Sequence, residues 1–203
     1  MKTAIPASER ALDRIRENGG FIRSKDAISY GIQSRTLNQL VKKGNLEQIS
    51  RGVYRLAGSE PISSPDLFTV ATRVPKGVIC LISALSFHDI TTQIPHKVYI
   101  ALERKAESPR LVYPPLAIHR FTGKAFHEGI VKHLIDGLEI KVYNPEKTLA
   151  DCFKFRNQIG MDVALEALKL YRSKKKLNMK DIYYYARICR VENVMRPYLE
   201  ALV

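Results

Sequence analysis

Hydrophobic and polar positions in the first sixty residues follow helical spacing in three stretches and strand-like alternation in a fourth. Each of the three helical stretches is preceded by a serine and followed by a glycine, which predicts short capped helices. The predicted elements are a helix capped by Ser8 that reaches about Glu17, an extended piece at 21–22, a helix at 25–30 capped by Ser24, a helix at 35–43 capped by Ser34, and a hairpin over 46–56 that turns at Arg51-Gly52.

This order of elements predicts a winged helix-turn-helix. The three residues Gly31-Ile32-Gln33 between the second and third helices have the length expected of the turn, and they supply its glycine. On the third helix, Leu37, Leu40 and Val41 share one face. The opposite face carries Arg35, Gln39 and Lys42, flanked by Thr36, Asn38 and Lys43. Side chains of these types bind base edges and phosphates, so this helix is the predicted recognition helix.

The stretch AGSEPISSP (57–65) is small, polar and proline-containing, which indicates a boundary between domains. The remaining residues alternate between helical and strand patterns. We expect a helix from Pro65 to about Thr72, a buried helix at 78–90, strands at 96–104 and 116–121, a hairpin over 129–143 that turns at Asp136-Gly137, a helix from Pro145 to about Phe155, and helices at about 162–173, 179–189 and 191–202. The fold class is therefore α+β, a winged helix-turn-helix plus a mixed α/β domain with a small sheet and a helical C-terminal end.

Charge narrows the choice of partner. The 203 residues include 33 Lys+Arg and 20 Asp+Glu, a net charge of +13. Such an excess favours a polyanionic partner such as nucleic acid, although a basic solvated surface is the alternative. Residues 1–60 carry 11 basic and 6 acidic side chains, and residues 61–203 carry 22 and 14. The larger part of the excess therefore lies beyond the predicted winged helix.

The sequence lacks the patterns of several other classes. Cys80, Cys152 and Cys189 are far apart and odd in number, which argues against a disulfide framework and a thiolate zinc site. The five histidines are scattered without metal-ligand spacing, and no nucleophile has an identifiable partner. No apolar window is long enough to cross a membrane, and the first residues do not form a signal peptide. We expect a cytoplasmic protein that is not an enzyme, with no catalytic residue, metal or cofactor.

Three segments of the sequence resemble segments of a known family. They are GNLEQISRGVYRL, PKGVICLISALSFHDITTQIPHKVYIAL and IKVYNPEKTLADCFKF. Together they are similar to the AbiEi-type antitoxins of abortive-infection type IV toxin–antitoxin systems and to related transcriptional regulators. The resemblance implies a DNA-binding domain at 1–58 and an antitoxin or effector domain at 59–203. It further implies repression of the protein's own operon and action against a nucleotidyltransferase-like toxin without a stable complex.

The predicted DNA-binding residues come from three segments. The recognition helix contributes Ser34, Arg35, Thr36, Asn38, Gln39 and Lys42; the start of the second helix contributes Ser24 and Lys25; and the hairpin tip contributes Arg51. The double-stranded operator is expected to hold inverted repeats, which would need two copies of the protein. For Ser24 and Lys25 a simple cap remains an equal alternative to a phosphate contact.

Two further points stay open at the level of sequence. A second basic patch of Lys169, Arg172, Lys174, Lys175, Lys176 and Lys180 could contact DNA or a toxin, or be a solvated surface. The chain could also be a stand-alone winged-helix regulator with a ligand- or protein-interaction domain and no toxin partner. Of Tyr183, Tyr184 and Tyr185, we expect core packing with one exposed ring, because consecutive helical positions cannot share a face.

Overall fold

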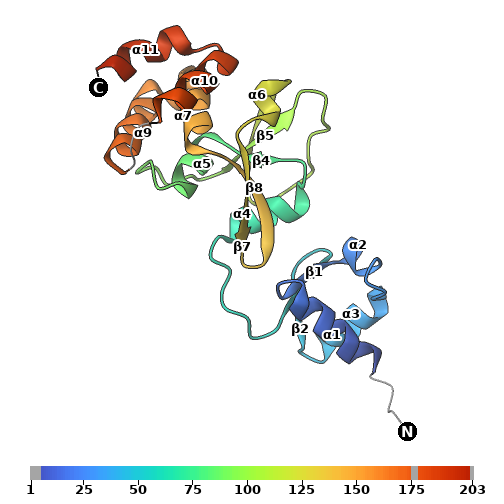
Figure 1. Cartoon of the computed structure of the whole chain (residues 1–203). Helices are drawn as coiled ribbons and strands as arrows, with labels where there is room; N and C mark the ends of the chain where they lie inside the picture. Colours follow the sequence, from blue (N-terminus) through green and yellow to red (C-terminus); the bar gives the residue numbers. More distant parts are fainter. Residues whose placement is uncertain (1–5, 175–177, 202–203) are drawn as a thin grey trace. The chain divides into compact units, whose positions relative to one another are not determined.

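The computed structural model describes residues 6–174 and 178–201 (Figure 1). The described chain divides into two compact units. The N-terminal unit comprises the residues up to Thr72 together with Leu134–Glu139, and the C-terminal unit comprises Arg73–His133 and the residues from Ile140 onward. Each unit is described below by itself.

The N-terminal unit is a winged helix, as the sequence predicts. Its elements are α1 (Ala7–Glu17), β1 (Phe21–Arg23), α2 (Ser24–Ala27), α3 (Ser34–Lys42), β2 (Leu46–Ser50), β3 (Val53–Leu56) and α4 (Pro65–Arg73). The three strands form an antiparallel sheet in the order β1-β3-β2. Ile15, Leu37 and Leu40 lie at the centre of the core that α1 and α3 share with the sheet.

The helix starts of this unit differ from the prediction. The N-caps of α1, α2 and α3 are Pro6, Arg23 and Gln33, and none of them makes a side-chain capping hydrogen bond. Ser24 and Ser34 are instead the first residues of their helices, and Ser8 lies inside α1. The predicted serine caps were therefore wrong. Packing of an apolar face supplies most of the stability of a helix in a folded protein, so these helices form without a side-chain cap.

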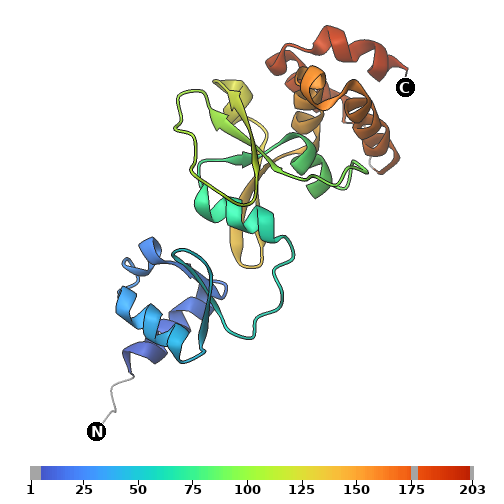
Figure 2. The same cartoon turned by 180° about the vertical axis from the view of Figure 1, so that it is seen from behind.

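The C-terminal unit combines a five-stranded sheet with a group of helices (Figures 1 and 2). Its elements are β4 (Val78–Ile79), α5 (Leu81–Phe87), β5 (Val98–Glu103), β6 (Leu116–Phe121), α6 (Lys124–His127), the greater part of β7 (Ile130–Ile135) and of β8 (Leu138–Tyr143), α7 (Pro145–Lys154), α8 (Arg156–Ile159), α9 (Met161–Lys174), α10 (Met179–Cys189) and α11 (Glu192–Glu200). The strand order is β6-β5-β4-β8-β7, and α7 packs against α5, α9 and α10.

The sequence prediction for residues 78–90 was wrong at its start. We expected one buried helix, but Val78 and Ile79 form β4 at the centre of the sheet, between β5 and β8. A short apolar run has the same composition in a buried strand and in a buried helix, and only the neighbouring strands decide between them. The four-residue helices α6 and α8 were also missed, because a single turn leaves no periodic pattern.

The buried centre of this unit contains an ion pair. Lys147 and Asp151 lie one turn apart on α7, and both side chains are fully buried. The Lys147 ammonium donates to both carboxylate oxygens of Asp151 at 2.6 Å, and it lies 4.2 Å from the ring centroid of Tyr143. The Cys189 thiol donates to Asp151 Oδ1 at 3.2 Å. These contacts tie α7 to α10 and to the end of β8.

Candidate nucleic-acid interface

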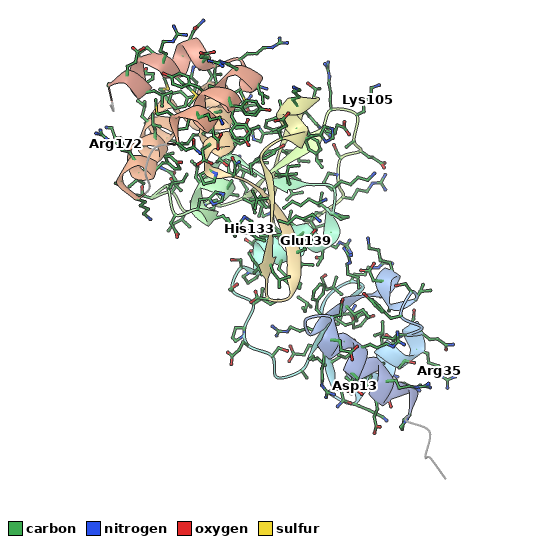
Figure 3. All side chains as sticks on the ribbon, viewed as in Figure 1. Asp13, Arg35, Lys105, His133, Glu139 and Arg172 are labelled. Atoms are coloured by element: carbon green, nitrogen blue, oxygen red, sulfur yellow. The ribbon has the colours of Figure 1, made fainter. Side chains whose placement is uncertain are left out.

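Helix α3 presents a polar face that the core leaves uncovered. Leu37 and Leu40 are 0% and 1% exposed, and they fix the helix against α1 and the sheet. The side chains on the outer face are those that the sequence predicts, namely exposed Ser34, Arg35, Asn38, Gln39 and Lys42 with half-buried Thr36. Figure 3 labels Arg35, on the N-terminal unit. The structure therefore places all six predicted residues of α3 at or near the surface.

The turn before α3 is closed by backbone hydrogen bonds. Gly31 adopts a left-handed φ of +71°, a conformation that glycine reaches without strain. The Ile32 amide donates to the Ala27 carbonyl at 2.8 Å, and the Ile32 side chain is buried in the core. The turn thus anchors α3 to α2 at a fixed angle, which a recognition helix needs in order to enter a groove with a defined orientation.

The wing lies next to the start of α2. Strand β1 pairs with β3, so that Arg23 is opposite Val53, and the Ser24 amide donates to the Gly52 carbonyl at 2.8 Å. Ser24 is half-buried, while Lys25 and Arg51 are exposed. The structure therefore brings the predicted residues of α2 and of the hairpin tip into one region, although 26 positions separate Lys25 from Arg51 in the sequence.

Helix α2 spans only four residues, so its N-terminus offers little to a phosphate beyond the Ser24 and Lys25 side chains. Other basic side chains of this unit form ion pairs within it. Arg23 forms an ion pair with Asp26, and Arg55 lies 2.9 Å from Glu47 across the β2–β3 ladder. These two arginines stabilise the fold locally, and they are not counted among the candidate DNA contacts.

One exposed apolar residue was missed by the sequence reasoning. Ile28 follows α2 directly and is 73% exposed, and nearby Tyr30 donates a hydrogen bond to Asn18 Oδ1 at 3.3 Å. Apolar side chains contact thymine methyl groups in the major groove. The exposure of Ile28 becomes evident only from the structure, in which its neighbours Ala27 and Ile32 are buried.

The second basic patch is only partly described. Lys169, Arg172 and Lys180 are exposed on α9 and α10, and Lys174 donates to the Asp89 carbonyl at 2.6 Å. Arg172 is labelled in Figure 3. Lys175 and Lys176 lie outside the described residues. The contact with Asp89 gives Lys174 a role within the fold of the C-terminal unit.

The three thiols and the tyrosine triplet are parts of the fold. Burial raises the pKa of the Cys80 and Cys152 thiols well above their ordinary value, with a further contribution from Asp151. Among Tyr183, Tyr184 and Tyr185, only Tyr184 is exposed, as expected.

Within residues 6–174 and 178–201, no group of three or more metal-ligating side chains is present. Among the same residues, no helix has the length and apolar character of a membrane span.

The N-terminal helix-turn-helix and wing also match a known family. Residues 9–57 match the AbiEi antitoxin family of transcriptional regulators. The matched segment runs from α1 to the last strand of the wing, so the AbiEi resemblance is confirmed for the region that carries the candidate interface. No curated protein matches the chain.

A solved structure resembles the fold of most of the chain. The crystal structure of the RV2827C protein from Mycobacterium tuberculosis aligns with a TM-score of 0.51 at 13% sequence identity. The alignment covers 93% of this chain and 79% of that chain. At this identity the likeness concerns the fold alone, and it extends from the AbiEi-like region into the C-terminal unit.

Proposed function

We propose that the chain is a DNA-binding transcriptional repressor of the AbiEi antitoxin type, which represses its own operon through a domain at residues 1–58. The observation that carries this proposal is the outer face of α3. Arg35, Asn38 and Gln39 are exposed there, while Leu37 and Leu40 hold the opposite side in the core of a winged helix. The family match of the same segment supports the assignment.

The interface divides into two kinds of contact. Arg35, Asn38 and Gln39 supply the donors and acceptors that distinguish bases in the major groove. Lys25, Arg51 and the Ser24 hydroxyl bind phosphates next to that groove, and such contacts position the protein without reading sequence. The operator contains inverted repeats bound by two copies, because one recognition helix reads only one half-site.

A promoter-reporter assay in cells tests the repressor function. The wild-type chain is expected to lower expression from the promoter of its own operon, and Arg35→Ala is expected to restore it. Arg14→Ala is the matched control, because Arg14 is an exposed arginine of α1 and its loss changes the net charge equally. Equal repression by wild type and Arg35→Ala would contradict the proposal, provided that the two proteins accumulate to the same level.

We further propose that residues 59–203 carry the antitoxin function and counter a nucleotidyltransferase-like toxin in the cytoplasm, without catalysis and without a stable complex. The support for an antitoxin function is indirect: the family matched by residues 9–57 is described as an antitoxin as well as a regulator, and the assignment to residues 59–203 follows from the second domain lying outside that DNA-binding segment. The full-length Arg35→Ala variant, produced at a fixed level together with the toxin encoded beside it, is expected to rescue growth although it no longer represses. Repression by the wild type without rescue would instead support a stand-alone regulator.

A further inference from the structure

A cavity in the C-terminal unit gathers three cations that come from distant parts of the sequence. It has a volume of about 490 Å³ and lies where α6 meets the ends of α7 and α10. Lys124 begins α6, Lys154 is the last residue of α7, and Arg190 directly follows α10. Thr122, Ile188 and Cys189 complete most of the lining. The volume falls in the range of small-ligand sites, about 300–1,000 Å³.

The charge of this cavity is positive and only partly compensated. No carboxylate lines it, and within the described parts of the chain none of the three cations forms an ion pair. The C-terminal ends of α7 and α10 each carry about half a negative charge, and the basic side chains of Lys154 and Arg190 at these ends offset it. Three cations against roughly one negative charge leave an excess of about two positive charges.

One of the cations is held by ring contacts before any ligand arrives, and another is placed at the cavity by the conformation of its backbone. The Lys154 ammonium lies 5.4 Å from the ring centroid of Phe121 and 5.8 Å from that of Phe155. Arg190 occupies the C-cap of α10 in the left-handed conformation, with φ of 60° and ψ of 42°. Glycine is the usual residue at such a helix end, because a side chain is strained there. The chain therefore tolerates backbone strain at the residue that brings a guanidinium to the cavity.

The remaining lining suits binding rather than covalent chemistry. Burial, with the nearby Asp151 carboxylate, raises the pKa of the Cys189 thiol to about 12, so the thiol stays protonated at neutral pH. Its hydrogen bond points inward to Asp151 Oδ1. Thr122 offers a hydroxyl, while Ile188 offers an apolar wall beside the charged groups. An arrangement of cations beside an apolar wall fits a phosphate joined to a less polar group.

We infer that this cavity binds a small phosphate monoester of about two negative charges, of the nucleoside monophosphate class. Lys124, Lys154 and Arg190 contact the phosphate, and Ile188 contacts the attached nucleoside. The inference does not depend on DNA binding, because every residue of the cavity belongs to the C-terminal unit.

Isothermal titration calorimetry of the full-length protein tests the inference, with the four ribonucleoside 5′-monophosphates and inorganic phosphate as probes. At least one nucleotide is expected to bind saturably with one site per chain and more tightly than phosphate alone. Arg190→Gly and Lys154→Met should each weaken that binding about 10- to 100-fold, the loss expected for a charge-assisted contact. Arg172→Ala removes an exposed arginine elsewhere in the same unit and should leave the affinity unchanged.

Arg190→Gly separates loss of the site from loss of the fold. Glycine relieves the left-handed backbone, so the melting temperature of this variant should equal or exceed that of the wild type. Absence of binding by every probe would overturn the inference, as would binding that Arg190→Gly leaves intact. Weaker binding of duplex DNA by Arg190→Gly, with no nucleotide bound by the wild type, would also overturn it and assign the cations to a nucleic-acid surface.

Discussion

The buried ion pair of α7 gives a quantitative prediction about stability. Lys147→Met removes the ammonium and leaves the Asp151 carboxylate fully buried, and the Cys189 thiol is then its one remaining side-chain hydrogen-bond donor among the described residues. Breaking a buried pair in this way costs about 3–5 kcal/mol. For a chain of this size, that loss lowers the melting temperature by about 6–20 °C. Urea unfolding and thermal melting followed by circular dichroism measure both quantities.

The same pair predicts how the loss depends on pH. Burial raises the pKa of the Asp151 carboxyl, and the Lys147 ammonium opposes that rise. Without Lys147 the pKa rises further, so the folded state holds a proton that the unfolded state releases, and stability falls as pH increases. The cost of Lys147→Met should therefore be larger at neutral pH than in mild acid.

The double variant completes this test. Lys147→Met combined with Asp151→Leu replaces the whole pair by apolar side chains and should recover most of the stability that the single variant loses, because no uncompensated charge remains. A cost below about 1 kcal/mol for Lys147→Met, within the range of an exposed pair, would refute the reasoning. A double variant no more stable than the single one would refute it as well.

Three further predictions concern the core, a helix cap and the ionic strength. Leu37→Ala, at a position with no exposure, should cost about 2–5 kcal/mol in urea unfolding and abolish operator binding together with the fold of the wing. Asn144→Ala should cost about 0.5–2 kcal/mol, because the Asn144 side chain accepts from the Lys147 amide at 2.8 Å and caps α7; Asn144→Asp should retain most of that stability. With about six phosphates neutralised, affinity for DNA should fall roughly 10³-fold between 50 and 200 mM salt. Arg51→Ala should reduce the slope of the logarithm of the binding constant against the logarithm of the salt concentration by about 1. An unchanged slope would exclude Arg51 from the interface.

The winged helix could be predicted from the sequence because its signals are local. The spacing of Leu37 and Leu40, the glycine of the turn and the hairpin at Arg51-Gly52 all act within a few residues. The hairpin at Asp136-Gly137 was predicted for the same reason, and both of its turn residues adopt positive φ. The serine caps failed because several residue types compete for a helix start and tertiary packing decides among them.

The features of the C-terminal unit that lie far apart in sequence could not be predicted. Lys147 and Asp151, four residues apart on a helix, have the spacing of an ordinary surface pair, and only the packing of α5, α9 and α10 around α7 shows them to be buried. The cavity joins Lys124, Lys154 and Arg190 through the ends of three helices, so no local pattern marks it. It accounts for part of the positive charge beyond residue 60.

The central claim is that α3 reads the operator, and the ratio of operator to scrambled-DNA affinity tests it most directly. Fluorescence anisotropy at fixed salt should show a high ratio for the wild type and for Arg14→Ala. Arg35→Ala and Gln39→Ala should each lose about 5- to 150-fold in operator affinity, equivalent to about 1–3 kcal/mol of base discrimination, with little change on scrambled DNA. Ratios for Arg35→Ala and Gln39→Ala equal to that of the wild type would contradict the account.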